Sequence, residues 1–222
     1  TLVSGGVVGI VLGLVGGGGS ILAVPLLVYV VGVRSPHVAI GTSAVAVAAS
    51  AAGKLLSHWK NGTVKWGCAA VFAAAGVVGA FGGSTAAKAV DGQRLLALFG
   101  LVMIVVGLLM LRPRSSEGDP DVRLTTESAG KLAPLLIGVG FTVGLFSGFF
   151  GIGGGFLIVP GLMLATGMPL SNAIGTSLFA VSAFGAATAG SYAVSGLIDW
   201  PMAGLFVFGG LVGGVAGVRI GK

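Results

Sequence analysis

The chain has 222 residues, of which 55% are hydrophobic and only 8% are charged, and its mean hydropathy is +1.07. Soluble domains usually carry about 25% charged residues, whereas this sequence has no acidic, basic or histidine side chain from Leu132 to Ile198. These values exclude a water-soluble fold, and the net charge of +6 indicates loop Lys and Arg residues of a membrane protein rather than nucleic-acid binding.

The predicted elements are apolar segments separated by polar breaks. In chain order they are Thr1–Val33, Val38–Leu56, Trp66–Ala87, Leu95–Leu111, Leu132–Gly167, Ala173–Val194 and Trp200–Val218. They lack the alternation of membrane β-barrels, so we predict transmembrane helices. Arg112–Lys131, with four basic and four acidic residues, is typical of a solvated linker. The sequence therefore predicts a first transmembrane repeat at 1–111, a linker at 112–131 and a second repeat at 132–222.

The two predicted repeats carry the same pattern. The string "AIGTS" occurs in both, so that Gly41 corresponds to Gly175, and the shift in residue number is 175 − 41 = 134. We call this difference the repeat shift. The same shift carries Trp66 to Trp200. Upstream, "GGGGSILAVP" corresponds to "GIGGGFLIVP" with a slip of one residue. Ordered matches at nearly one spacing indicate an internal duplication.

The first segment of each half is too long for one simple span and is interrupted by glycines. It is either a broken helix that crosses the membrane or a re-entrant pair of half-helices. The loop Lys54–Lys65 has three lysines and no acid, whereas its counterpart, Thr188–Asp199, carries only an acid. Because basic loops favour the cytoplasm, this difference favours inverted repeats. The counterpart of Leu95–Leu111 would follow Lys222, so the last helix of the second repeat is expected to be missing from the sequence.

The glycine runs predict half-helix N-termini inside the membrane. Glycine interrupts helices, and the freed backbone groups survive in the bilayer only inside protein or beside a polar cavity. The N–H groups and dipole of a half-helix N-terminus attract anions, and transporters use discontinuous helices in this way. The candidate substrate-binding residues in these runs are Gly17, Gly18, Gly19, Ser20, Gly153, Gly154 and Gly155.

The two Gly-Thr-Ser strings follow the glycine runs and offer hydroxyl donors near the start of the next span. The alternative is that their hydroxyls bond helix carbonyls or bridge helices. The duplication favours a shared anion site formed by Gly41, Thr42, Ser43, Gly175, Thr176 and Ser177.

Cations at the ends of the spans are candidates for attracting or relaying the anion. They are Arg34, His37, Lys54 and His58. The alternative for Lys54 is a side chain that reaches from a helix end to the membrane surface, and for His58 a solvated loop residue. The single cysteine, Cys68, excludes an internal disulfide and a multi-cysteine metal site. We expect no metal, no cofactor and no enzymatic activity, because the sequence has none of the hydrolase, zinc or nucleotide motifs.

These features resemble the sulfite exporter TauE/SafE family of bacterial membrane transporters, also described as toluene-sulfonate uptake permeases. The resemblance covers nearly the whole chain and depends on the combination of "GIGGGFLIVP" with "NAIGTS". Family motifs correspond to Gly17–Ser20, Pro25, Gly41–Ser43, Gly153–Gly155, Pro160 and Gly175–Ser177. The resemblance implies transport of small sulfur-containing anions such as sulfite, sulfonates or sulfoacetate.

We therefore expect an all-α, polytopic protein of the bacterial plasma membrane that acts as a secondary transporter by alternating access. The expected partners are a small sulfur anion and the lipid bilayer, with no nucleic acid, and a homodimer is left open. The alternatives are a passive small-anion channel and a non-transporting membrane enzyme or assembly factor. The sequence leaves open which anion moves, in which direction and with which coupling ion.

Overall fold

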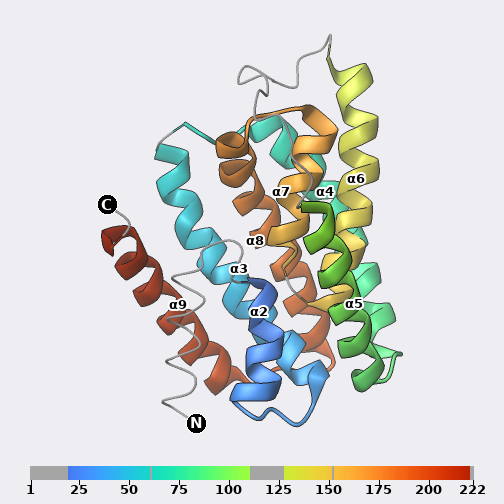
Figure 1. The fold of residues 1–222 in the computed structure, drawn as a ribbon, viewed down its shortest axis with the longest axis vertical. Coiled ribbons are helices and arrows are strands. Elements are labelled where there is room, and N and C mark those ends of the chain that lie inside the picture. The colour runs from blue at the N-terminus through green and yellow to red at the C-terminus, as the bar shows by residue number, and fades with distance from the viewer. Residues whose placement is uncertain (1–19, 61, 111–127, 152, 221–222) are drawn as a thin grey trace.

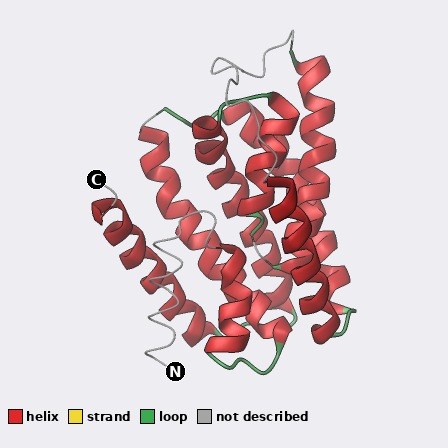
Figure 2. Ribbon diagram, in the orientation of Figure 1, coloured by secondary structure: helices red, strands yellow, loops and turns green. Residues whose placement is uncertain are grey.

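The computed structural model describes residues 20–60, 62–110, 128–151 and 153–220, and every regular element in these ranges is helical (Figure 2). In chain order the elements are α2 (Ser20–Pro25), the π-helical turn η2 (Leu26–Val30), α3 (Pro36–Lys60), α4 (Trp66–Lys88), α5 (Gly92–Met110), α6 (Ala129–Phe150), α7 (Gly155–Thr166), α8 (Leu170–Val194) and α9 (Trp200–Ile220). Among the described residues, α3, α4, α6 and α8 are long and apolar enough to cross a membrane. The expected all-α membrane architecture is therefore confirmed at this level.

The helices reproduce the internal spacing of the sequence. The repeat shift carries both ends of α3 onto the ends of α8, since 170 − 36 and 194 − 60 both equal 134. Helices α4 and α9 begin at the corresponding Trp66 and Trp200. The turn between α3 and α4 also corresponds to the turn between α8 and α9, because Gly62 and Gly196 have φ values of 68° and 67°. Glycine adopts this left-handed conformation without the steric cost of a Cβ atom.

Helices α3 and α8 pack antiparallel at the centre of the bundle (Figure 1). Gly41, near the start of α3, touches Leu197, which follows α8. Gly175, near the start of α8, touches Thr63, which follows α3. The repeat shift carries Gly41 to Gly175 and Thr63 to Leu197, so the pairing of α3 with α8 is reciprocal.

Helix α4 packs along α6 of the other half rather than along a neighbour from its own half. The α6 glycines that make this contact are spaced by four residues: Gly140, Gly144 and Gly148. A Cβ atom on each would meet the backbone of Phe72, Gly76 and Ala80, respectively. The residue numbers of the contacting pairs increase together along α6 and α4, so the two helices run parallel. Small residues of this kind let membrane helices approach backbone to backbone.

Candidate functional site

The chain is interrupted between α6 and α7, at the second predicted glycine run. Helix α6 ends at Phe150, and Gly151, Gly153 and Gly154 have φ values of 67°, 65° and 69°. Three such residues in four positions stop a helix, because a residue with a Cβ atom is strained at each of them. Helix α7 starts at Gly155 and folds back along α6, since Gly161 contacts Val139 and Val143 of α6.

This break lies beside the middle of the central helix pair. A Cβ atom on Gly153 would overlap the Val47 side chain of α3 and lie 3.5 Å from Cγ1 of Val181 in α8. The repeat shift carries Val47 to Val181, since 181 − 47 = 134, and each valine is near the middle of its own helix. Gly153 is therefore placed between corresponding positions of the two halves, near the middle of α3 and of α8, whereas Gly151 contacts Ile40 near the start of α3.

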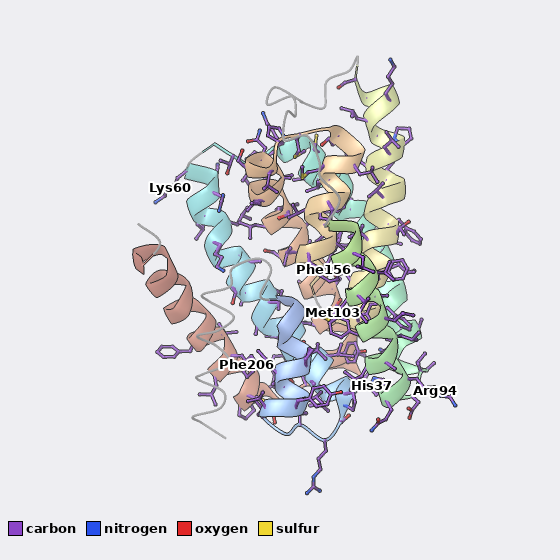
Figure 3. The ribbon with its side chains drawn as sticks, in the orientation of Figure 1. His37, Lys60, Arg94, Met103, Phe156 and Phe206 are labelled. Atoms are coloured by element: carbon purple, nitrogen blue, oxygen red, sulfur yellow. The ribbon has the colours of Figure 1, made fainter. Side chains whose placement is uncertain are left out.

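The first turn of α7 is a candidate donor site in an apolar environment, because an α-helix leaves its first N–H groups without intrahelical acceptors. Gly154 O accepts hydrogen bonds of 2.8 Å from the N–H groups of Leu157 and Ile158, so the N–H groups that could face an anion are those of Gly155 and Phe156. Phe99 and Met103 of α5 pack with Phe150 and Phe156 on either side of the break (Figure 3). Low polarity of this kind strengthens the attraction of a helix N-terminus for an anion.

Ser147 adds a hydroxyl group that the sequence analysis did not single out. Its side chain is fully buried, and its Oγ has no hydrogen-bond partner among the described residues. This Oγ lies 2.8 Å from the position that a Cβ atom would take on Gly154, the N-cap residue of α7. Its signal in the sequence is weak: a lone serine in an apolar stretch, one helical turn before Gly151.

The Gly-Thr-Ser threonines connect the two halves. Thr42 Oγ1 accepts a hydrogen bond of 3.1 Å from the backbone N–H of Asp199. Thr176 Oγ1 accepts one of 3.0 Å from the backbone N–H of Lys65. Both threonines are fully buried, and both donors stand one residue before a helix that starts with tryptophan. The helix-bridging role, which the sequence left as the alternative, is the one visible in these contacts, while each hydroxyl keeps its own hydrogen to donate.

The serines of the two strings bond backward within their helices. Ser43 Oγ donates to Ile40 O at 2.9 Å and lies 3.3 Å from Gly151 O. Ser177 Oγ donates to Ile174 O at 2.8 Å. Of the two strings, the one in α3 thus reaches the glycine break directly, through Ser43.

The glycines of these strings allow a close approach between the two halves. A Cβ atom on Gly41 would overlap Leu197 O, and one on Gly175 would overlap Thr63 Oγ1. Of the first predicted run, Gly17, Gly18 and Gly19 lie outside the described residues, and Ser20 is the first residue of α2.

The candidate cations separate to the two ends of the bundle. Arg34 lies just before α3 and His37 lies in its first turn, whereas Lys54 and His58 lie in its last two turns. Figure 3 shows His37 and Lys60 at opposite ends of the molecule. His58 Nδ1 lies 3.1 Å from Thr63 Oγ1. None of the four is among the residues nearest to Gly151, Gly153 or Gly154, and the described residues contain no group of three His, Cys, Asp or Glu that could hold a metal.

Comparison with known proteins agrees with this architecture. Residues 1–222 match the profile of the family described as "Sulfite exporter TauE/SafE". A "Probable membrane transporter protein" of Xylella fastidiosa (strain 9a5c) is 54% identical over 99% of this chain and 83% of its own length. "Probable membrane transporter protein YunE" of Bacillus subtilis (strain 168) is 31% identical over 100% of this chain and 87% of its own. No solved structure matches the chain.

Proposed function

The chain belongs to the TauE/SafE sulfite exporter family, and from this premise we propose that it carries a small sulfur oxyanion across the membrane by alternating access. It is a membrane transporter with several membrane-spanning helices, and its location is the bacterial inner membrane. The substrate class proposed is sulfite, a sulfonate or a sulfoacetate-like anion.

The observation that carries this proposal is the α7 N-terminus with Ser147 beside it, next to the middle of α3 and α8. A helix N-terminus acts as roughly half a positive charge, and a serine hydroxyl donates a further hydrogen bond. From Leu132 to Ile198 there is no charged side chain. Neutral donors therefore hold the anion here, and they bind it without the desolvation penalty of a buried ammonium group.

We propose that the two halves, 1–111 and 132–222, are inverted repeats joined by the linker 112–131. The antiparallel pairing of α3 and α8 supports this, as does the fold-back of α7 along α6 (Figure 1). Inverted repeats place one site at their interface and allow it to open to each side in turn. Gly17–Ser20 is the proposed counterpart of Gly153–Gly155 in the first half, and the Gly-Thr-Ser strings hold the two halves together around the site.

The four basic residues at the bundle ends are proposed to attract or relay the anion at its two entrances. Arg34 and His37 serve one end, and Lys54 and His58 serve the other. An inside-negative membrane potential adds about 2.3 kcal/mol per charge per 100 mV and favours movement of an anion outward. The membrane potential therefore favours export over import.

The test uses the purified protein in proteoliposomes with radiolabelled sulfite. We expect saturable uptake above that of protein-free vesicles, and acceleration of labelled uptake when unlabelled sulfite is loaded inside. A passive channel, the competing function, would give flux without this counterflow. Absence of flux for sulfite, sulfonates and sulfoacetate alike would reject the proposed function.

The site itself is tested with Ser147→Ala. Loss of one hydrogen bond to an anion is expected to raise the KM for sulfite about tenfold. Ser182→Ala is the matched control, because Ser182 Oγ already donates to Leu178 O at 2.7 Å and is only partly buried. Equal KM values for the two variants would remove Ser147 from the site.

A further inference from the structure

Helix α8 carries a row of side chains that leads away from the glycine break. Val181, Thr188 and Tyr192 are separated by seven and four residues. At 3.6 residues per turn they lie within about 40° of one direction around the helix. Val181 is the residue that contacts Gly153. The row therefore starts beside the break at Val181 and faces α3, since a Cβ atom on Gly41 of α3 would lie 2.9 Å from Cβ of Tyr192. Thr188 and Tyr192 lie about 10 Å and about 16 Å along α8 from Val181.

The two polar members of this row are buried without partners. Thr188 and Tyr192 are fully buried, and among the described residues neither Thr188 Oγ1 nor Tyr192 Oη has a hydrogen-bond partner. A serine or threonine hydroxyl in a helix can bond the carbonyl one turn back, as Ser182 does with Leu178 O at 2.7 Å, but Thr188 does not. An unpaired buried hydroxyl costs about 1–3 kcal/mol, and packing of this side of α8 against α3 does not by itself account for two of them in one row.

The row ends beside a cation. Lys88 Nζ lies 5.7 Å from the centre of the Tyr192 ring. It donates to Ser191 O and Ser191 Oγ at 3.1 Å and to Ser195 Oγ at 2.9 Å. These bonds fix the ammonium group at the C-terminal end of α8, where an anion leaving or entering the row would meet it.

We propose that Ser147, Thr188 and Tyr192 donate successive hydrogen bonds to the anion on its route between the α7 N-terminus and the Lys88 end of the bundle. This inference rests on the proposed function, and it adds the path to the site. Hydroxyl hydrogen bonds to an anion are stronger than those between neutral groups, yet each is weak enough to be exchanged for the next.

The repeat shift gives the corresponding row on α3. Thr188 corresponds to Lys54 and Tyr192 to His58, since 188 − 134 = 54 and 192 − 134 = 58. The hydroxyl groups of one helix are thus replaced by basic side chains on the other. At these two positions α8 therefore carries hydroxyl groups where α3 carries Lys54 and His58.

The flux test compares Thr188→Val and Tyr192→Phe with the wild-type protein in proteoliposomes loaded with radiolabelled sulfite. Each substitution removes a hydroxyl group and little volume. We expect each to raise the KM for sulfite about tenfold, while the melting temperature in detergent stays the same or rises because an unpaired buried group is gone. Thr142→Val is the control, since Thr142 is exposed on α6 and its Oγ1 donates to Gly138 O at 2.9 Å.

Accessibility gives a readout that packing alone would not produce. In a Cys68→Ala background, Thr188→Cys is expected to react with a water-soluble, negatively charged thiosulfonate. Ala186→Cys, two residues away on the exposed side of α8, is expected to stay unreactive in the bilayer.

The two proposals fail separately. If the wild-type protein moves no sulfur anion, the proposed function is rejected. If the wild-type protein transports sulfite, and Thr188→Val and Tyr192→Phe keep its KM while Thr188→Cys is inert, the hydroxyl route is rejected and the proposed function stands.

Discussion

The hydroxyl oxygen of Thr42 accepts a hydrogen bond from the backbone N–H of Asp199 at 3.1 Å. The repeat shift carries Thr42 to Thr176 and Lys65 to Asp199, and the equivalent bond joins Lys65 N–H to Thr176 Oγ1 at 3.0 Å. Each half thus uses its threonine to satisfy the peptide group that precedes a helix of the other half. The duplicated string is a reciprocal connection between the ends of α3 and α8.

This connection predicts a stability effect for Thr42→Val and Thr176→Val. Each change leaves a buried N–H without its acceptor, which costs about 1–3 kcal/mol in the free energy of unfolding. Thr42→Ser and Thr176→Ser keep the acceptor and should recover most of the loss. Unfolding in detergent, followed by circular dichroism, measures the effect. If the valine variants instead keep their stability and lose affinity for sulfite, the two hydroxyl groups bind the substrate and do not stabilise the helix ends.

The glycine break predicts a difference between two glycines with the same backbone conformation. Gly153 and Gly196 have φ values of 65° and 67°, but a Cβ atom on Gly196 meets nothing within 4 Å, whereas one on Gly153 would overlap Val47. Gly196→Ala should cost about 1–2 kcal/mol from the left-handed conformation alone. Gly153→Ala should cost more and abolish sulfite flux. Equal losses of stability and flux in the two variants would show that the position of Gly153 is not special.

The contact between α4 and α6 predicts opposite outcomes for two alanine substitutions on one helix. Gly144→Ala would drive a methyl group into Gly76 O, whereas a Cβ atom on Gly138 meets nothing within 4 Å. Gly144→Ala is expected to destabilise the protein by about 1–3 kcal/mol, the usual cost of overpacking. Gly138→Ala should be neutral or stabilise α6, because alanine is the better helix former by about 1 kcal/mol. Melting temperatures of the two variants in the same detergent measure the difference, and equal values would contradict the prediction.

The position of Lys54 on α3 predicts an electrostatic effect on transport. Lys54 occupies the position on α3 that Thr188 occupies on α8, so Lys54→Met should raise the KM for sulfite several-fold and weaken its dependence on ionic strength. Lys60→Met is the control, because Lys60 is exposed at the C-terminal end of α3. Initial rates at low and high salt measure the effect. A response from Lys60→Met as large as that from Lys54→Met would assign the effect to general surface charge.

The sequence was informative where a local rule governs the structure. The apolar segments Val38–Leu56 and Ala173–Val194 predicted α3 and α8 but not all of their ends, which lie at Pro36–Lys60 and Leu170–Val194 and are related by the repeat shift. The glycine run near Gly153 predicted an interrupted helix, because positive φ values favour glycine. The uses of single hydroxyls could not be predicted in the same way. Whether Thr42 meets a solute or Asp199 depends on how the ends of two distant helices meet, and Ser147 shows no periodic or composition signal that marks it as different from any packed serine.

The parallel packing of α4 on α6 also has a consequence for biosynthesis. When the ribosome has delivered only residues 1–111 to the membrane, the small-residue face of α4 that Gly144 and Gly148 later cover has only lipid beside it. Neither half of the chain can reach its final packing before the other is inserted. Packing of α4 is therefore a late event in the bilayer, which waits for α6 to be inserted.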